Sequence, residues 1–285
     1  MSDETSPEIE RDREVKALDA SGRLGTLGRY WINRNLPEFA RQYFPASGLR
    51  VLDIGCGDGP YYELLRKAAL AGEYLGIDIR ESEFWKERGA GEQALHPTFK
   101  VWDAHRIDSL GRSFNAVISV TAFEHFRADR SVMKSVSRVL EPGGHALIIV
   151  PSPYGSLVWG FSHGFRKYTP RRFGNLLDDT ELDLVEAVPA GAAPSLIANG
   201  LWFGASGLLG RAIRYGAYAR YLGDRRAARA AHPWVKDAVA RIQYGHLRYG
   251  LGRAIHGHLN DALYAADEQV KLCPTQWLFV LRRRS

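Results

Sequence analysis

The amino-acid sequence predicts an α/β fold in which helices cover both faces of a seven-stranded, mostly parallel sheet, with a helical insert before the last strand. Short β-branched and aliphatic runs of strand length alternate with segments of helical periodicity through the first two thirds of the chain. Several of these runs end in an acidic or small residue, which is typical of strand ends that face a ligand. The alternation itself favours a doubly wound parallel sheet.

The composition is that of an ordinary globular protein of 285 residues, with 45% hydrophobic and 25% charged residues. The two cysteines, Cys56 and Cys273, are too few and too far apart to indicate a disulfide framework or a metal cluster. The first 18 residues are charged and lack the apolar core of a secretory signal, and no run reaches 18 uninterrupted apolar residues. We therefore expect a cytoplasmic protein without a bound metal.

The positive charge of the chain is concentrated near its end. The net charge is +6, but residues 195–285 contain 14 Lys and Arg against 5 Asp and Glu, whereas residues 1–194 contain 24 against 27. Such an asymmetry calls for a hypothesis about the partner of the last third of the chain.

The predicted elements divide the chain into four segments. We expect an N-terminal helical cap over residues 1–48, a core over 49–194, a basic helical insert over 195–270, and the final strand of the core within 271–285. The predicted strands cover residues 51–54, 73–80, 98–104, 113–120, 145–150, 181–190 and 275–284, and the insert is predicted as helices over 196–221 and 233–267. Aromatic residues between 24 and 44 predict a helix that either caps the ligand site or packs on the sheet.

A glycine-rich turn follows the first predicted strand. Gly55, Gly57 and Gly59 alternate behind Asp53, and Pro60 is a favoured first residue of the helix that begins there. Missing side chains let the backbone approach a ligand, and the free N–H groups of the helix start face it. A dinucleotide fingerprint needs a glycine at position 60, so the spacing disfavours a nicotinamide or flavin cofactor. The alternative is an ordinary tight turn between a strand and a helix.

Asp78 ends the second predicted strand, 19 residues beyond Gly59. A carboxylate at this place can accept hydrogen bonds from both hydroxyls of a ribose. The neighbouring Ile79 would then lie against one face of an adenine ring. The alternative is that Asp78 caps a helix over residues 81–88.

Asp103 and Ala104 end the third predicted strand. The carboxylate can accept from the exocyclic amine of adenine, while the N–H of Ala104 donates to a ring nitrogen. The alternative is that Asp103 is a cap or turn residue. Ser119, near the end of the fourth strand, would join Gly55 and these acids at one edge of the sheet.

Six motifs, in their order and spacing, resemble those of class I S-adenosylmethionine-dependent methyltransferases. They are Asp-Ile-Gly-Cys-Gly-Asp-Gly at 53–59, Gly-Ile-Asp-Ile at 76–79, Trp-Asp-Ala at 102–104, Phe-Asn-Ala-Val-Ile-Ser at 114–119, Phe-Glu-His-Phe at 123–126 and Arg-Val-Leu-Glu-Pro-Gly-Gly at 138–144. The resemblance covers about residues 48–152 and implies a Rossmann-like fold that binds S-adenosylmethionine. The cofactor-binding residues expected from these motifs are Asp53, Gly55, Gly57, Asp78, Ile79, Asp103, Ala104 and Ser119. Family members usually carry Asp where this chain has Asn115, a departure outside the expected cofactor contacts.

The substrate side is predicted from a segment after the fifth strand. His163, Arg166, Tyr168 and Thr169-Pro170 are similar to a His…Arg-Tyr/Phe-Thr-Pro segment beside the substrate pocket in the glycan and quinone branches of the family. His163 is the candidate general base, since an imidazole titrates near neutral pH; the alternative is that it holds the loop by a backbone hydrogen bond. Arg166 and Tyr168 are candidates for binding an anionic or sugar substrate. Thr169 is expected to cap a helix that Pro170 begins, which is a structural role.

The predicted function is S-adenosylmethionine-dependent O-methylation of a small molecule such as a sugar or a secondary metabolite. The alternatives are an RNA or lipid-linked acceptor that uses the basic insert, or a catalytically silent partner protein that binds the cofactor. The insert itself is open to interpretation as a lid, as the interface of a homodimer, or as a peripheral membrane contact. Arg and Tyr alternate in the insert, as in surfaces that bind nucleic acid, but no RNA-binding module accompanies them.

Overall fold

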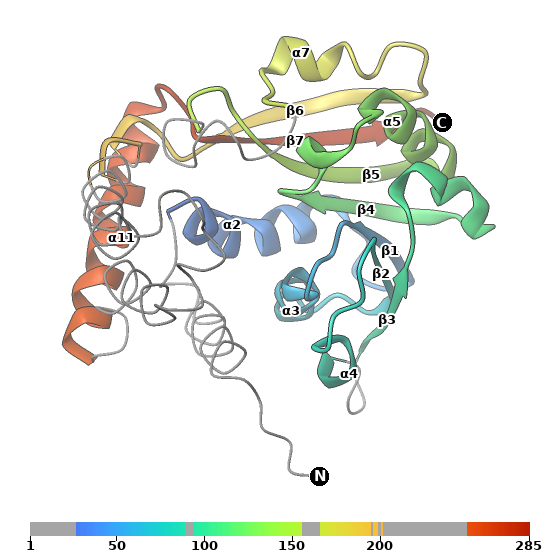
Figure 1. Ribbon diagram of the computed structural model, residues 1–285, viewed down its shortest axis with the longest axis horizontal. Helices are drawn as coiled ribbons and strands as arrows, with labels where there is room; N and C mark the ends of the chain where they lie inside the picture. The colour runs from blue at the N-terminus through green and yellow to red at the C-terminus, as the bar shows by residue number, and fades with distance from the viewer. Residues whose placement is uncertain (1–26, 89–93, 156–165, 195, 199–200, 202–249) are drawn as a thin grey trace, which may run out of the picture.

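The computed structural model describes residues 27–88, 94–155, 166–194, 196–198, 201 and 250–285. Within these residues, seven strands form one sheet in the order β3-β2-β1-β4-β5-β7-β6 (Figure 1). The strands are β1 Leu49–Ile54, β2 Gly72–Asp78, β3 Leu95–Val101, β4 Phe114–Val120, β5 Leu140–Pro151, β6 Leu182–Ala190 and β7 Gln276–Arg283. All pairs from β3 across to β5 are parallel, and β7 runs antiparallel to both of its neighbours. The predicted Rossmann-like, mostly parallel sheet is confirmed.

Helices lie on both faces of the sheet, as predicted. They are α2 Leu27–Tyr43, α3 Pro60–Lys67, α4 Trp85–Arg88, α5 Asp129–Val139, α7 Pro170–Gly174 and α11 Gly250–Val270, with 3-10 helices η1 Ala104–Leu110 and η2 Phe123–His125. Leu278 of β7 packs in the core under α2 and α3, whereas the next residue, Phe279, packs in the core with α5 and α7. Successive residues of a strand point to opposite faces, so one strand supplies both cores.

The strand register brings the ends of four strands to one edge of the sheet. The N–H groups of Gly55 and Cys56 both donate to the Ile77 carbonyl, at 2.8 and 3.0 Å, which ties the glycine turn to the end of β2. The N–H of Thr121 donates to the Ile149 carbonyl at 2.8 Å, which ties the segment after β4 to β5. Ligands of doubly wound sheets bind at this carboxyl edge.

The N-terminal helix packs on the sheet. The helix predicted between residues 24 and 44 is present as α2, and Trp31, Leu36 and Phe44 are buried in the core beneath it. The interpretation of this helix as a sheet-packing element is therefore confirmed. Residues 1–26, which complete the predicted cap, lie outside the described residues.

Three local features differ from the expected pattern or refine it. The connection from β3 to β4 is the short η1, not a full helix. Thr169 caps α7, its hydroxyl accepting from the Arg172 N–H at 3.2 Å, and Pro170 is the first helical residue, as predicted. The α11 helix falls in the second predicted helix of the insert, whereas residues 202–249 lie outside the described part of the chain.

Asn115 has a structural role that explains the tolerated departure from the family pattern. Its Oδ1 accepts from the Arg50 N–H at 2.8 Å, and its Nδ2 donates to the Gly48 carbonyl at 2.9 Å. An ionised Asp could make only the first of these bonds, because a carboxylate has no donor. Asn115 therefore fastens β4 to the start of β1, far from the carboxyl edge.

Candidate active site

The glycine turn has a backbone that only glycine adopts easily. Gly55 and Gly57 have φ angles of 76° and 53°, in the left-handed region. A Cβ on Gly55 would lie 2.4 Å from the Ala122 Cβ, so no larger residue fits there. A Cβ on Gly57 would have no atom within 4 Å, so the turn is open at this point. A ligand can therefore approach the backbone at Gly57.

Asp78 faces the glycine turn. Its Oδ2 accepts from the Gly57 N–H at 3.0 Å, and its Oδ1 accepts from the Arg80 N–H at 3.1 Å. The next helix, α4, begins only at Trp85, so Asp78 does not cap it. Ile79 is 71% exposed, although it is a large apolar residue. A carboxylate and an exposed apolar side chain therefore stand side by side at the end of β2.

Asp53 is buried directly before the turn. The Tyr74 hydroxyl donates to its Oδ2 at 2.5 Å, whereas Oδ1 has no hydrogen-bond partner. Burial raises the pKa of this carboxyl to about 7; the Tyr74 bond lowers it, and the charge of Asp78 raises it further. A buried acceptor without a partner is costly to the fold. Asp53 therefore offers a binding atom to a ligand that brings a donor.

Asp103 and Ala104 begin η1. Oδ1 of Asp103 accepts from the His105 N–H at 2.9 Å and lies 2.8 Å from His105 Nδ1. These bonds, the backbone one first, hold the pKa of Asp103 below its usual value. The alternative that Asp103 is a cap is therefore confirmed, while its contact with adenine, and that of the Ala104 N–H, stay predictions.

Ser119 does not reach the turn. Its side chain is fully buried, and its hydroxyl donates to the Ile54 carbonyl at 3.0 Å. That bond fastens β4 to the end of β1 and uses the only donor of the side chain. The predicted cofactor contact of Ser119 is therefore corrected to a structural role.

The side chains of Arg166 and Tyr168 also bond to other residues of the protein. Both contact Oδ2 of Asp129 at 2.9 Å, Arg166 through Nε and Tyr168 through its hydroxyl. The guanidinium of Arg166 donates to the carbonyls of Phe126 and Arg127 at 2.6 and 2.7 Å as well. Tyr168 is fully buried. The predicted substrate contacts of these two residues are corrected: they hold the segment after β4 in place. His163, the predicted base, lies outside the described residues.

Glu124 is the candidate that reasoning from the sequence missed. It lies in η2, is 5% exposed, and its Oε2 has no hydrogen-bond partner. Burial raises the pKa of its carboxyl to about 7, while a backbone hydrogen bond and the charge of Lys167 oppose the rise. Burial in turn lowers the pKa of Lys167. The available signal was an acid between Phe123 and Phe126 directly after a strand.

The segment that carries Glu124 packs against the glycine turn. Ala122 occupies the place that a side chain on Gly55 would need, and Phe126 Cζ lies 3.9 Å from the same point. Lys167 adjoins Tyr168, whose N–H donates to the Pro151 carbonyl at 3.1 Å, at the end of β5. Glu124 therefore lies on a segment that packs against the glycine turn, and its carboxyl interacts with the charge of Lys167.

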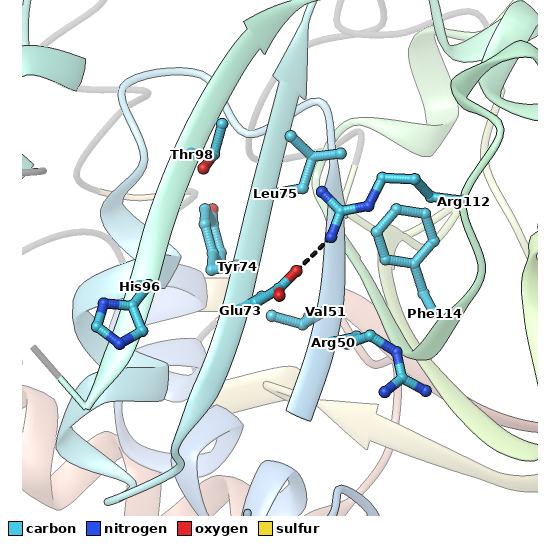
Figure 2. Close-up of a pocket in the computed structure, with 9 residues that line it drawn as sticks. All are labelled: Arg50, Val51, Glu73, Tyr74, Leu75, His96, Thr98, Arg112 and Phe114. Atoms are coloured by element: carbon cyan, nitrogen blue, oxygen red, sulfur yellow. Dashed lines mark hydrogen bonds and ion pairs between the residues drawn. The ribbon is translucent and has the colours of Figure 1, made fainter. Parts of the chain in front are cut away.

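A cavity of about 280 Å³ lies elsewhere, at the amino-terminal half of the sheet (Figure 2). Its lining residues are Arg50, Val51, Glu73, Tyr74, Leu75, His96, Thr98, Arg112 and Phe114. Figure 2 shows the Arg112 guanidinium reaching across it to pair with Glu73. Arg50, another cation of the lining, pairs with Glu141, and the lining includes none of the residues of the glycine turn.

The fold and the turn define the class of site. An open glycine turn, a carboxylate on the next strand and an exposed apolar neighbour at the carboxyl edge of a parallel sheet form a site for a cofactor that contains a nucleoside. Among the described residues, no group of three or more His, Cys, Asp or Glu side chains is arranged to hold a metal ion. No helix in the described ranges has the length and apolar character needed to cross a bilayer.

Comparison with known proteins finds similarity to methyltransferases over part of the chain. The family model described as "Methyltransferase domain" matches residues 51–144. A ubiquinone biosynthesis O-methyltransferase of Ruegeria pomeroyi is 33% identical over 101 residues, which are 35% of this chain and 40% of that protein. One from Ruegeria sp. is 27% identical over 158 residues, covering 50% of this chain and 63% of that protein.

Solved structures of similar fold include an S-adenosylmethionine-dependent methyltransferase from Mesorhizobium loti. It is 15% identical with a TM-score of 0.46, and the match covers 88% of this chain and 100% of that one. The chain spans between 40% and 63% of the length of the curated relatives it matches.

The residues at the turn fit S-adenosylmethionine. The unpaired Asp53 Oδ1 suits a ligand donor, and the open side of Gly57 suits close approach of a ligand. Asp78 retains acceptor capacity for ribose hydroxyls, since each carboxylate oxygen can accept more than one bond. Residues 53–79 thus offer the cofactor an unpaired acceptor at Asp53, a carboxylate at Asp78 and an exposed apolar side chain at Ile79.

Proposed function

We propose that the protein transfers the methyl group of S-adenosylmethionine to a hydroxyl of a small molecule, with a phenolic secondary metabolite favoured over a sugar. The observation that carries this proposal is Glu124, a buried carboxyl with an unpaired oxygen on the segment that packs against the glycine turn. When bound, the cofactor supplies an electrophilic methyl group on a sulfonium. Everything else in the reaction falls to the residues of this chain.

The chain's first task is to bind and orient the cofactor. Asp78 is proposed to accept the ribose hydroxyls, Ile79 to cover adenine, and Asp53 to accept from a donor of the methionyl part. Asp103 is proposed to accept a hydrogen bond from the exocyclic amine of adenine, and the N–H of Ala104 to donate to a ring nitrogen. Positioning of this kind lowers the barrier by supplying the reactants in the correct geometry.

The second task is to remove the proton from the acceptor hydroxyl. A base works best when its pKa lies near the working pH, and burial brings the Glu124 pKa to about 7. We assign the proton to the unpaired Oε2 of Glu124. Before this transfer, the partly buried Lys167 ammonium balances the charge of the ionised Glu124 carboxylate. His163 stays an alternative base, predicted from the sequence.

The basicity of Glu124 favours a phenolic acceptor. A phenol has a pKa of about 10, so its proton reaches a carboxylate of pKa about 7 at a cost of about 4 kcal/mol. An aliphatic hydroxyl has a pKa close to that of water, about 15.7, and the same transfer costs about 12 kcal/mol. Glu124 is therefore better matched to a phenol than to a sugar hydroxyl. The printed name of the relatives, O-methyltransferase, supports oxygen as the acceptor atom.

The proposal is tested by methyl transfer from isotopically labelled S-adenosylmethionine to three acceptors: 3,4-dihydroxybenzoate, methyl α-glucoside and transfer RNA. We expect label on the phenol and little on the sugar, with an activity that rises with pH through about 7 as Glu124 loses its proton. Label on the RNA, with a steep loss at high salt, would favour the nucleic-acid alternative. Binding of the cofactor without any labelled product would favour the silent partner protein.

A further inference from the structure

Two consecutive residues of α2 reach in opposite directions. Arg29 donates through Nη1 to the Tyr61 hydroxyl at 2.5 Å, and its guanidinium carbon lies 5.2 Å from the centre of the Tyr61 ring. Tyr30 donates instead to the carboxylate of Asp261 on α11. Figure 1 shows α2 running between α3 and α11, and α2 contacts both helices. One turn of α2 therefore joins the helix after the glycine turn to the last helix of the insert.

The contact between α2 and α11 is built from polar aromatic groups, which we call the α2–α11 clasp. Besides the Tyr30 bond, the Tyr264 hydroxyl donates to Asn35 Oδ1 at 3.1 Å. The Arg34 guanidinium lies 4.8 Å from the centre of the Tyr264 ring, and the rings of Tyr30 and Tyr264 meet edge to face at 5.8 Å. Directional contacts of this kind allow one register between the helices, whereas an apolar stripe would tolerate sliding.

Tyr30 makes its bond from a buried position. It is 2% exposed, and burial, followed by the Asp261 bond, raises the pKa of its hydroxyl. Arg34 of the same helix also donates to this hydroxyl, at 3.4 Å, so the bond to Asp261 is the one that ties Tyr30 to α11. At the other end of α2, the Tyr43 hydroxyl makes a similar but exposed bond to Glu186 at 3.0 Å. That bond is a natural comparison, because it joins α2 to β6 and not to α11.

The other end of this connection is the cofactor turn. Tyr61 is the second residue of α3, which begins at Pro60 directly after Gly59. It is buried, and it also hydrogen-bonds the side chain of Thr121, the residue after β4. The Tyr61 side chain thus contacts Arg29 of α2 and Thr121 directly after β4. Arg29 therefore contacts a side chain at the start of α3 directly.

We propose that Tyr30 and Tyr264 are positioning residues for the cofactor site, which act by docking α11 on α2 so that Arg29 holds Tyr61 in place. The proposal rests on the assignment of S-adenosylmethionine to the glycine turn. Coupling between two sites is reciprocal, so the cofactor stabilises the clasp as much as the clasp strengthens cofactor binding. The insert that ends in α11 is thereby linked to the loading of the cofactor.

The test is calorimetric titration of S-adenosylhomocysteine into the wild-type protein and three full-length variants. We expect Tyr30→Phe to weaken binding about tenfold, within the range of typical coupling energies, and Tyr264→Phe to weaken it in the same direction. Tyr43→Phe is the matched control, since it removes a tyrosine–carboxylate bond from α2 away from α11. Its affinity should stay within twofold of wild type.

Hydrogen exchange tests the coupling directly, because binding of the cofactor would not slow exchange in α11 if the clasp only stabilised the fold. S-adenosylhomocysteine should slow exchange of residues 258–270 in the wild type, and this protection should be reduced in Tyr30→Phe. If both clasp variants melt earlier but bind S-adenosylhomocysteine as the wild type does, the clasp is structural and the proposal is overturned. If the wild type itself fails to bind, the cofactor assignment fails together with the coupling. The preceding outcome, in which the wild type binds, overturns the coupling alone.

Discussion

Two regions of the carboxyl edge, the glycine turn after β1 and the segment after β4, do their work in different ways. At the turn, we expect binding to depend on backbone conformation, because Gly55 and Gly57 both adopt left-handed angles and Gly57 leaves room for a ligand. After β4, most polar side chains satisfy one another, as in the contacts of Arg166 and Tyr168 with Asp129. The lesson is that a polar residue near an active site can bind a ligand only when the fold leaves it an unused donor or spare acceptor capacity.

The two regions share one feature that marks both as functional. Each contains a buried carboxyl with an unpaired oxygen, Asp53 at the turn and Glu124 after β4, and burial raises both pKa values to about 7. Perturbed carboxyls in apolar surroundings are typical of functional sites. We assign Asp53 to the cofactor and Glu124 to the acceptor, and the following predictions test that division.

The largest effect is expected at the turn. Gly55→Ala forces a left-handed backbone on alanine and places a Cβ 2.4 Å from the Ala122 Cβ. We expect S-adenosylhomocysteine binding to be abolished in a calorimetric titration, with a clear loss of thermal stability. Gly111→Ala is the control, because its φ is 63° but nothing lies within 4 Å of the new Cβ. It should cost only about 1–2 kcal/mol of backbone strain. Binding by Gly55→Ala within tenfold of wild type would contradict the role of the turn.

The buried carboxyls predict an unusual pH dependence of stability. Burial raises the folded-state pKa of Asp53 from 3.8 to about 7, so between these values the folded state binds a proton that the unfolded state has lost. The free energy of unfolding should therefore fall as pH rises through this window, by up to about 1.4 kcal/mol per pH unit. Asp53→Asn should flatten the slope in urea denaturation between pH 4 and 7.

Asp103 provides the opposite case. Its pKa is lowered by hydrogen bonds from His105, so its stabilisation is present above the unfolded pKa and is lost as the pH falls through the lower, folded pKa. Asp103→Asn should therefore leave the slope between pH 4 and 7 unchanged. An identical slope in wild type and Asp53→Asn would show that Asp53 is not protonated by burial.

Glu124→Gln should lower the kcat/KM of methyl transfer about 100-fold, because an amide cannot accept the proton, while the affinity for S-adenosylhomocysteine stays unchanged. The rate is measured with labelled cofactor on the acceptor that the wild type methylates. The control is Glu63→Gln, which should keep full activity. It alters a carboxylate of α3 that pairs with Arg66 of the same helix and with Arg88 of α4. Full activity of Glu124→Gln would return the base role to His163.

The smallest effect is expected where a predicted binding residue proved structural. Tyr168→Phe removes the hydroxyl bond to Asp129 and should cost about 1–2 kcal/mol of unfolding free energy in denaturant titration. The KM for the acceptor should not change. A raised KM with unchanged stability would restore Tyr168 to the substrate site.

The sequence predicted the fold and the turn well because their signals are local. Strand runs, glycine spacing and the Thr169 cap depend on neighbours in the chain, and each is present in the structure. Ser119, Arg166 and Tyr168 were assigned to ligands because their partners, Ile54 and Asp129, are distant in sequence. Glu124 was missed for the converse reason: an unpaired oxygen shows only when all neighbours are placed. For a polar side chain, pairing is a property of the fold and not of the motif.

The central claim is that the turn between β1 and α3, with Asp78, binds S-adenosylmethionine. Its most direct test is calorimetric titration of S-adenosylhomocysteine into the wild type, Asp78→Ala and, as a control from the same loop, Glu81→Ala. The account predicts binding by the wild type and by Glu81→Ala, and at least tenfold weaker binding by Asp78→Ala. Equal affinity of Asp78→Ala and the wild type would contradict it.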